Sequence, residues 1–412
     1  MTLSGYEIAW VWGEMVSEAV TAAGHVGGRR RPRNRKAHII DAAIVLFNSD
    51  GYHRVGMEDI ASAVGITAGA LYRHFSSKQD LLAAALLTVI DEFVDLASAA
   101  APDGIDAVLR SLARRAVERR DRGPLWQQHA RDVSSQQRTV VRRRLRVLAG
   151  RISGPLRAAR PELSQPDANL LTWAILAVLA SPSEHGIALG RPRLEDVLCR
   201  GAGALCATRR LPAPDRPSPA GTGVATGLAP ASRREVLLVT AGRLFRESGF
   251  DAVTMESIGA AAGISGPSVY NHFASKADLL GAVLDRGRET LQLGLAQALA
   301  GVKTPEQALG PVVRSYVIPA LRPDALTGLL FSETRHLPDE RRRAVRRAQR
   351  DYVDEWARLL PVGQAEGRVV VHAAIALINS LVLIPHLRGR PGFEDEIVDL
   401  AVEVLRSAAP AA

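Results

Sequence analysis

Cysteine is almost missing from this sequence, and its scarcity excludes a disulfide-stabilised fold. Among 412 residues only Cys199 and Cys206 occur. They share one expected helix and lie roughly 10 Å apart along its axis at about 1.5 Å per residue, too far for a disulfide unless the helix breaks. No Cys/His group has metal-ligand spacing either. We therefore expect no metal, no cofactor, and a reducing, cytoplasmic environment.

Strand-like and membrane-spanning patterns are also scarce. Alternation of Val, Thr and Tyr is nearly absent, whereas hydrophobic residues make up 47% of the chain, so an all-α protein with ample cores is expected. The longest apolar stretch, 369–385, is interrupted by three polar residues, and its roughly 17 residues barely reach bilayer-spanning length. Residues 1–28 lack the basic start and the unbroken apolar run of a signal peptide.

The sequence also has no arrangement of residues that indicates catalysis. A nucleophile elbow, a phosphate-binding loop and a metal-spaced His/Cys cluster are all missing, and the ten histidines are scattered. No catalytic residue is therefore predicted, and an enzyme is the weakest alternative.

Charge indicates a different class of partner. The net charge of +9 is concentrated in residues 1–210, which carry +8 against +1 for 211–412. A basic excess on one half favours binding to a polyanion, and nucleic acid is the foremost candidate. A general packaging protein would bind DNA with little sequence preference, and +9 is a modest charge for that role.

Residues 57–78 have the spacing of a helix-turn-helix. Ala61 is small where two helices would cross closely, and Gly65 follows four positions later, where a tight turn asks for positive φ. Leu71, six positions further on, supplies the apolar contact, and Thr67 can cap the second helix. This pattern is typical of a DNA-reading helix pair.

The motif occurs twice. Residues 255–276 repeat it 198 positions later without a gap. The residues that recur at the shifted positions are Met57, Glu58, Ile60, Gly65, Ile66, Tyr72, His74, Phe75, Ser77, Lys78, Asp80, Leu81 and Leu82. A further pair, 190–196 and 389–395, recurs 199 positions apart, each before an apolar final helix. The chain is therefore predicted to be a tandem repeat of two units of about 200 residues.

Composition and the repeat divide the chain into segments. We expect a loosely ordered extension (1–28), a first helix-turn-helix domain with a basic arm (29–83), a first helical body (84–208), a proline-rich linker (209–231), a second helix-turn-helix domain (232–281) and a second helical body (282–412). Residues 29–36 hold six positive charges in eight positions. They favour an arm that lies in a DNA groove, with a solvated tail as the alternative.

The two heads resemble the DNA-binding domain of the TetR family of transcriptional regulators. In the first copy the resemblance rests on Phe47, Gly51, Tyr52, Ile60, Ala61, Gly65, Ile66, Leu71, Tyr72, Arg73, His74, Phe75, Lys78, Leu81 and Leu82, and the second copy matches as well. Two units in one polypeptide are similar to the tandem TetR-type regulators of actinobacteria, a group that includes repressors of mycobacterial mammalian-cell-entry operons.

This resemblance implies an all-α fold of two fused TetR-like subunits, each with a three-helix head and a helical ligand and dimerisation body. The last two helices of each body, near 167–182, 193–207, 367–384 and 393–408, would then pair as a four-helix bundle. Because a tether raises effective concentration, the chain is expected to form an intramolecular pseudo-dimer that is monomeric or weakly self-associating.

The resemblance also assigns the DNA contacts. It places a tyrosine, a histidine and a lysine of each copy against phosphates, and base reading at the start of the second motif helix and at the position between Tyr and His. With the basic arm and one helix cap, the predicted DNA-binding residues are Arg31, Arg33, Arg35, Lys36, Thr67, Ala68, Gly69, Ala70, Tyr72, Arg73, His74, Lys78, Thr254, Ser265, Gly266, Pro267, Ser268, Tyr270, Asn271, His272 and Lys276. The alternatives are packing roles for the tyrosines and histidines and plain solvation for the lysines.

For the bodies the resemblance implies a small-molecule effector whose binding separates the heads and releases DNA. The candidate contacts lie on the middle helices: Trp126, His129, Phe331, Glu333 and Arg335. The alternative roles of these residues are core packing and ion pairing. Apolar bodies favour an apolar effector.

The arginine runs 142–144 and 341–343 are expected to be solvated helix faces. The alternative function is a regulator in which one head binds DNA and the other is a structural mate.

Overall fold

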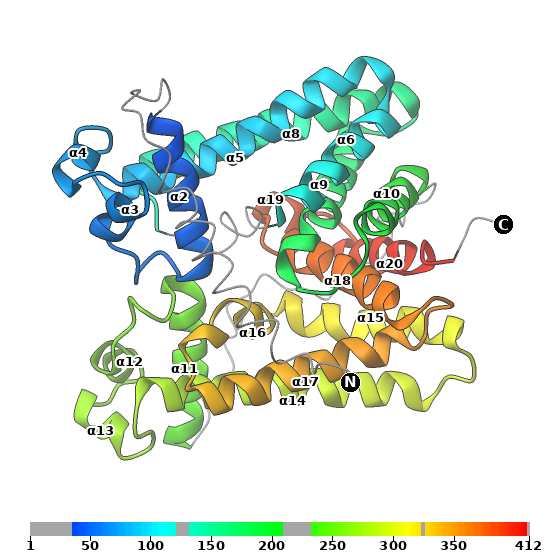
Figure 1. Ribbon diagram of the computed structural model, residues 1–412. Coiled ribbons are helices and arrows are strands. Elements are labelled where there is room, and N and C mark those ends of the chain that lie inside the picture. The colour runs from blue at the N-terminus through cyan, green and yellow to red at the C-terminus, as the bar shows by residue number, and fades with distance from the viewer. Residues whose placement is uncertain (1–34, 121–131, 209–231, 323–325, 410–412) are drawn as a thin grey trace, which may run out of the picture. The chain divides into compact units, whose positions relative to one another are not determined.

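The computed structural model describes residues 35–120, 132–208, 232–322 and 326–409, and every regular element in these ranges is a helix (Figure 1). The all-α expectation is thereby confirmed. The helices are α2 (Arg35–Ser49), α3 (Met57–Ala63), α4 (Ala68–Tyr72), α5 (Lys78–Ala100), α6 (Ile105–Glu118), α8 (Ser135–Ala159), α9 (Gln165–Ala180), α10 (Arg191–Ala207), α11 (Arg233–Ser248), α12 (Met255–Ala261), α13 (Gly266–Tyr270), α14 (Lys276–Ala300), α15 (Pro305–Leu321), α16 (Thr327–Ser332), α17 (Asp339–Ala357), α18 (Gln364–Leu381), α19 (Pro385–Arg388) and α20 (Phe393–Arg406). Short 3-10 turns follow α5, α9 and α16 at Ala101–Asp103, Ser181–Glu184 and Thr334–His336.

Two compact units divide the chain, Met1–Thr88 and Val89–Ala412. The first contains the first head, α2 to α4 with the start of α5. The second contains both helical bodies and the second head, α11 to α13 with the start of α14. None of the described helices has both the length and the continuous apolarity that a bilayer crossing requires.

Each head is built around a buried apolar stripe on its first helix. In α2 the stripe includes Ile44 and Phe47, both fully buried, and in α11 it includes Ala241 and Phe245. Residues three or four apart lie on one face of a helix, so this spacing presents one surface to the helix-turn-helix. Val269 fills the same position in the second head as Leu71 does in the first, and both are fully buried.

The turn inside each motif has the conformation that the sequence predicts. Gly65 has φ +65° and Gly263 has φ +70°, a region that glycine adopts without steric penalty. One residue later, the Ile66 amide donates to the Ala61 carbonyl at 2.9 Å, and Ile264 donates to Gly259 at 2.9 Å. These bonds satisfy carbonyls at the end of the first motif helix and fix the angle at which the second helix leaves.

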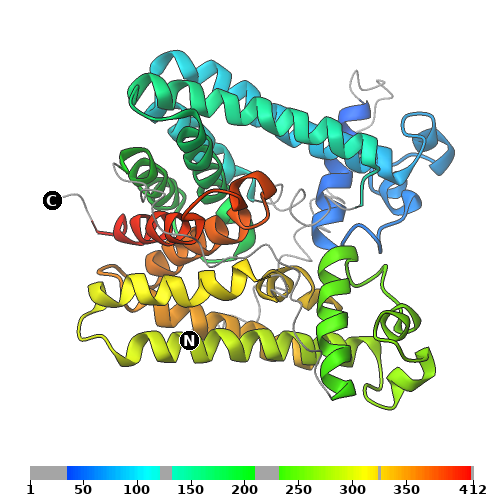
Figure 2. The ribbon, with the colours of Figure 1, turned by 180° about the vertical axis from the view of Figure 1, so that it is seen from behind.

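A seam of four helices joins the two bodies. Helix α9 packs on α18, and α10 packs on both α18 and α20 (Figures 1 and 2). The seam is apolar along most of its length, and Gly201 of α10 faces Val178 of α9 and Val404 of α20. These are the four segments that the sequence predicts to meet.

Two clusters of charged residues cross the seam. Arg390 donates to Asp167 at 2.6 Å and also binds Glu396 of its own body. On the other side Glu366 accepts from Arg193 at 2.9 Å and from Arg200 at 2.5 Å. Asp167 and Glu366 occupy equivalent positions of the repeat, but their arginine partners come from non-equivalent positions. The seam therefore joins two unlike surfaces.

A pair of histidines also meets across the seam. The rings of His185 and His372 lie 4.8 Å apart, and an Arg120 nitrogen donates to the His185 carbonyl at 2.6 Å. Burial lowers the pKa of His372 to about 4, with the nearby Arg368 charge adding to the shift. The pKa of His185 is also well below its ordinary value, first through burial and then through His372 and Arg120. Both rings are therefore neutral in the folded chain at pH 7.

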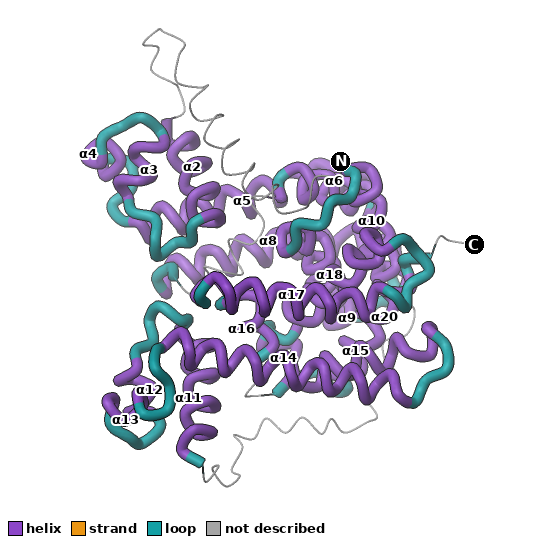
Figure 3. The backbone as a smooth tube through the Cα atoms, turned by 60° about the horizontal axis from the view of Figure 1, so that its bottom comes forward, coloured by secondary structure: helices purple, strands orange, loops and turns teal. Residues whose placement is uncertain are grey.

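In the second body, α14 runs beside α15 and α17, and α18 packs against α17 (Figure 3). Aromatic rings fill the space between these helices. Tyr316 and Tyr352 each have a ring centroid about 6 Å from that of Trp356, at 6.1 and 6.0 Å. The described residues contain no group of three or more His, Cys, Asp or Glu side chains arranged to hold a metal ion.

Replacing Gly65 by alanine should loosen the first head. A non-glycine residue at positive φ costs roughly 1–2 kcal/mol, which corresponds to a five- to thirtyfold change in an opening equilibrium. Hydrogen exchange of peptides covering residues 57–75 should accelerate by about that factor. The matched control is Gly69→Ala, because Gly69 lies in α4 with open space around it. Equal hydrogen-exchange protection in the Gly65→Ala and Gly69→Ala variants would contradict the need for glycine at the turn.

Acid should weaken the second unit through the histidine pair. Because the folded-state pKa of His372 is depressed to about 4, the unfolded chain binds the proton first as the pH falls below about 6.5. Stability is therefore present above that pH and is lost between about 6.5 and 4. The free energy of unfolding, measured with urea, should fall from pH 7 to pH 5 by about 1–2 kcal/mol more in the parent chain than in the His372→Gln variant. An equal difference in both would refute this.

Candidate nucleic-acid interface

The second motif helix of each head presents its end to solvent. Tyr72 is 53% exposed and Tyr270 is 52% exposed, whereas the residues directly before them, Leu71 and Val269, are fully buried. The predicted residues that follow are exposed as well: Arg73, His74, Asn271 and His272. The packing alternative for these tyrosines and histidines therefore does not match the structure. Three exposed polar side chains in each head are therefore available to a ligand outside the fold.

At the beginning of these helices the two copies differ. The Thr67 hydroxyl accepts a hydrogen bond from the Ala70 amide at 3.2 Å and caps α4, as the sequence predicts. In the second copy the Ser265 hydroxyl instead bonds the Ser268 hydroxyl at 2.7 Å. Gly69 and Pro267 are exposed, and Ala68, Ala70 and Ser268 are half-buried.

Gly266, a predicted base-reading residue, has a packing constraint of its own. A Cβ placed on it would lie 3.2 Å from the Glu256 Cα, closer than side chains normally approach backbone. Gly259 is similarly tight, since its Cβ would lie 3.1 Å from the Gly266 Cα. The two glycines thus allow α12 and α13 to cross closely, a role that the small residue at this motif position predicts.

The predicted lysines are half-buried and bind their own heads. The Lys276 ammonium donates to the carbonyls of Phe250 and Val253, both at 2.8 Å, and lies 4.1 Å from the centre of the Phe250 ring. Lys78 lies over the Tyr52 ring at 4.4 Å, with the His53 carbonyl at 3.5 Å. Plain solvation, the alternative for these lysines, therefore does not match the structure. Each lysine ties the start of its long helix to the loop before the motif.

Recurring Ser and Asp residues beside these lysines have a structural role that sequence reasoning missed. The Asp80 amide donates to the Ser77 hydroxyl at 3.0 Å, and that hydroxyl donates to the Asp80 carboxylate at 2.8 Å. Ser275 and Asp278 repeat the arrangement at 3.1 and 2.8 Å. The Ser-x-x-Asp spacing is the signal that could have identified this helix cap. An acid in the first turn also suits the helix dipole.

The predicted basic arm, residues 29–36, can be placed only in part. Arg31 and Arg33 lie outside the described residues. Arg35 and Lys36 are exposed on the first turn of α2, and the Lys36 nitrogen lies 5.4 Å from the centre of the Phe75 ring. The repeat reproduces that contact with Arg234 over Phe273 at 5.0 Å. These cations therefore attach the first helix to the end of the motif.

The first motif helix is capped differently in the two heads. Thr254 accepts from the Ser257 amide at 3.1 Å and its own amide donates to the Ser257 hydroxyl at 3.0 Å. In the first head Gly56 has no side chain for this, and its amide donates to the Asp59 carboxylate at 2.7 Å. The exposed Thr254 hydroxyl has no equivalent in the first copy.

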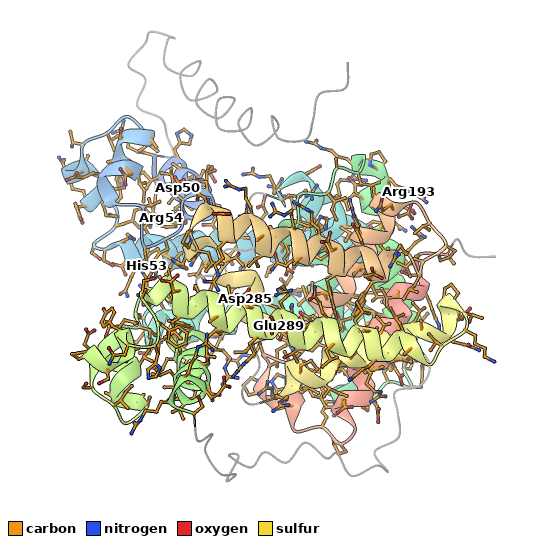
Figure 4. The ribbon with its side chains drawn as sticks, turned by 90° about the horizontal axis from the view of Figure 1, so that it is seen from below. Asp50, His53, Arg54, Arg193, Asp285 and Glu289 are labelled. Carbon is orange, nitrogen blue, oxygen red and sulfur yellow. The ribbon has the colours of Figure 1, made fainter. Side chains whose placement is uncertain are left out.

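The second head is fastened to its own body by the segment from α16 to the start of α17. The His336 ring stacks on Phe250 with centroids 4.6 Å apart. Arg341 donates to Asp285 at 2.6 Å and lies 3.8 Å from Asp278, the acid that caps α14; Asp285 is labelled on that helix in Figure 4. The same figure shows Asp50, His53 and Arg54 on the loop between α2 and α3 of the first head.

The arginine runs are solvated only in part: Arg142, Arg143 and Arg343 are exposed as expected, whereas other members form ion pairs. Arg144 forms an ion pair with Asp91, and Arg341 forms the pair with Asp285 just described. Both side chains remain more than 30% exposed, so these pairs orient helices more than they stabilise them. The expectation for the two runs is corrected accordingly.

A cavity of about 850 Å³ lies in the second unit. Its walls come from α14, α15, α17 and α18, from the α16 region and from residues 183–188 of the first body. Of the predicted ligand residues, Trp126 and His129 lie outside the described residues, as does the side chain of Phe331. Glu333 and Arg335 are not part of the lining, although their neighbours Leu330 and Thr334 are.

Sequence reasoning missed the polar part of this lining, which includes Arg288, Arg346, Arg350, Arg368 and His372. No local signal marks these residues, because they belong to α14, α17 and α18 and meet only when the helices pack.

Comparison with known families identifies both heads. The pattern of "Bacterial regulatory proteins, tetR family" matches residues 39–85 and again 237–283. The pattern of "Tetracyclin repressor-like, C-terminal domain" matches residues 302–383.

Among curated relatives, the transcriptional activator FasR of Mycolicibacterium smegmatis is 39% identical over 82 residues, which are 20% of this chain and 37% of FasR. The repressor KstR of the same organism is 35% identical over 72 residues, 18% of this chain and 35% of KstR. The regulator AcrR of Shigella flexneri is 38% identical over 53 residues, 13% of this chain and 25% of AcrR. The chain thus matches between a quarter and about two fifths of these relatives' own length.

Two solved structures align with about two fifths of the chain. A TetR-family transcriptional regulator from Bordetella parapertussis has 18% identity and a TM-score of 0.38, covering 43% of this chain and 95% of its own. AibR, solved in complex with isovaleryl coenzyme A and operator DNA, has 21% identity and a TM-score of 0.38, covering 43% of this chain and 99% of its own.

Replacing Lys276 by methionine should destabilise the second head, because two carbonyls would lose a charged donor while the contact with Phe250 is kept in part. Hydrogen bonds to charged groups contribute about 1.5–3 kcal/mol, and Lys276 is only partly buried, so an effect of about 1–2 kcal/mol is expected. Hydrogen exchange of peptides covering 250–275 should accelerate, whereas Tyr270→Ala, which removes an exposed ring, should leave it unchanged. Unchanged exchange in both variants would contradict the structural role.

Proposed function

We propose, from the premise that the chain belongs to the TetR family and carries two of its DNA-binding domains in tandem, that it is a transcriptional regulator that binds one operator with both heads. One observation carries the proposal. Both copies of the motif keep the same exposed tyrosine, 53% and 52% accessible, on a helix whose other side is buried in the head. A head retained only as a structural mate would have no reason to keep that ring in solvent.

The phosphate contacts in this proposal come from Tyr72, His74, Tyr270 and His272, together with the exposed arginine and lysine at the start of α2. Lys78 and Lys276 act indirectly, by holding the loop and the recognition helix in one arrangement. Thr254 offers its hydroxyl in the second head alone. Residues 28–82 carry +4 whereas 230–280 are neutral, so the first head supplies more of the salt-dependent affinity.

The operator has two unlike half-sites. At the variable position the first head presents Arg73 and the second presents Asn271, both exposed. Arginine favours guanine through its two major-groove acceptors, and asparagine favours adenine. Gly69 and Pro267 differ at the exposed start of the helices. Because the two heads cannot exchange places without a change of sequence preference, a perfect palindrome is not the preferred site.

One chain supplies both halves of the dimer that family members form from two chains. The seam of α9, α10, α18 and α20 supports this, as do its unlike ion pairs: Arg390 with Asp167 on one side, Arg193 and Arg200 with Glu366 on the other. Two copies of one half could not reproduce both sets of partners. The chain is therefore a pseudo-dimer that works as a single polypeptide.

An effector held in the cavity of the second body releases the DNA. Leu330 and Thr334 line the cavity, and the segment that contains them continues into His336 and Arg341, which contact the second head. A ligand that displaces this segment changes the support of Phe250, whose carbonyl and ring bind Lys276. Repression lifted by a small molecule is the mode of action that this connection favours, in the cytoplasm where the chromosome is.

The rival functions have less support. Members of the family regulate transcription and are not enzymes, so an enzyme is set aside. A nonspecific packaging protein has no need for two motifs that differ only where bases are read. The one-headed regulator remains the competing proposal, and the tyrosines distinguish it.

Alanine at Tyr72 and at Tyr270 should each weaken operator binding roughly tenfold, about 1.4 kcal/mol, and the double variant should lose more than either. Fluorescence anisotropy with the footprinted upstream DNA measures the affinities at several salt concentrations. Leu293→Ala is the control, because that side chain is 61% exposed on α14 outside the heads. A loss in only one of the two single variants would favour the one-headed regulator instead.

A further inference from the structure

The cavity of the second body has a charge that its apolar surroundings do not explain. Four arginines line it, Arg288, Arg346, Arg350 and Arg368, against one carboxylate, Glu184. Most of the remaining wall is hydrocarbon or aromatic and includes Leu291, Val345, Val353, Tyr316 and Ile375. Arg346 and Arg350 are exposed, so both can offer guanidinium donors to an anion that enters this 850 Å³ space.

Two of the four arginines already have partners. Arg368 donates to Asp354 at 2.5 Å, and Arg288 donates to Gln292 at 2.9 Å. Arg346 and Arg350 lie one turn apart on α17 and have no hydrogen bond or ion pair with any described residue. Burial, followed by the like charges of Arg342 and Arg350, lowers the pKa of Arg346. Arg368 and, to a smaller extent, Arg350 lower the pKa of the Asp354 carboxyl, so Asp354 offsets part of this charge, whereas Arg346 has no carboxylate partner among the described residues.

A polar atom without a partner points to the same conclusion. The His185 Nε2 is buried and makes no hydrogen bond with the described residues, and His185 lines the cavity. Its Nδ1 accepts from the Ile187 amide, which leaves the Nε2 as a donor. A buried donor without a partner costs about 1–3 kcal/mol, and a ligand with acceptor oxygens would remove that cost. His185 belongs to the first body, so both halves of the chain contribute to the wall.

We infer that the cavity binds an amphipathic anion, a molecule with an apolar body and one carboxylate or phosphate group, with its charged end at Arg346 and Arg350. This inference rests on the proposed function, in which the cavity is the effector site, and it replaces the purely apolar effector predicted from composition. An 850 Å³ cavity is within the range of about 300–1,000 Å³ typical of small-molecule sites. Arginine suits both carboxylate and phosphate because its planar donors match two oxygens at once.

Binding of three probes with the same tail tests the charge requirement. Decanoate, decyl phosphate and decanol, kept below their aggregation limits, are titrated into the full chain without DNA by isothermal calorimetry. At least one of the two anions should bind tenfold or more tightly than decanol, and the tighter anion identifies the favoured head group. Equal binding of decanol, or no binding of either anion, overturns the inference.

Single substitutions test where the charged end of the ligand binds. Arg346→Gln should weaken binding of the favoured anion about tenfold and leave decanol unchanged. Arg347→Gln is the matched control, since Arg347 is the next residue of α17 and is not part of the lining. An equal loss in Arg346→Gln and Arg347→Gln would contradict the site.

The same titration repeated with operator DNA separates this inference from the proposed function. Anion binding that leaves DNA affinity unchanged would refute release by an effector while the ligand class stands. If the chain without ligand does not bind operator DNA but still binds the anion, only the regulatory role is refuted.

Discussion

The seam between the two bodies is the interaction on which the rest of the second unit depends. Helices α9, α10, α18 and α20 pack against one another there, while α6, α8, α15 and α17 cover other faces of these helices within each body. Arg390, only 15% exposed, is held by Glu396 of its own body and donates across the seam to Asp167. Because Asp167 is 31% exposed, this pair sets the register of the two halves more than it stabilises them.

Each head shows how closely fold and function share the same few residues. The turn glycine, the small crossing residue and the Ser-x-x-Asp cap recur because they set the geometry of three short helices, none of which is long enough to be stable alone. The lysine beside the cap serves that geometry as well, through the Phe250 and Val253 carbonyls in the second head. Recurrence in a tandem repeat thus marks structural need as often as contact with DNA, and exposure separates the two.

Much of this could be predicted from the sequence. Gly65 and Gly263 predict the turns, and the recurrence of residues 57–78 without a gap 198 positions later predicts two heads, because local spacing alone determines a helix-turn-helix. The cavity could not be predicted in the same way. Its arginines lie on α14, α17 and α18, and only tertiary packing brings them together. The direction of long side chains such as Lys276 depends likewise on neighbours distant in sequence, so the bonds of this residue to two carbonyls of its own head were not predicted.

Tandem fusion allows the two halves to diverge, and here they differ in head charge, in helix caps and in their seam partners. Such divergence is useful only if one chain, and not two, occupies an operator. Native mass spectrometry of the full chain with footprinted operator DNA measures this directly. The account predicts a complex of one chain per duplex at saturation, with free protein at the mass of a single chain. A complex of two chains per duplex would contradict it.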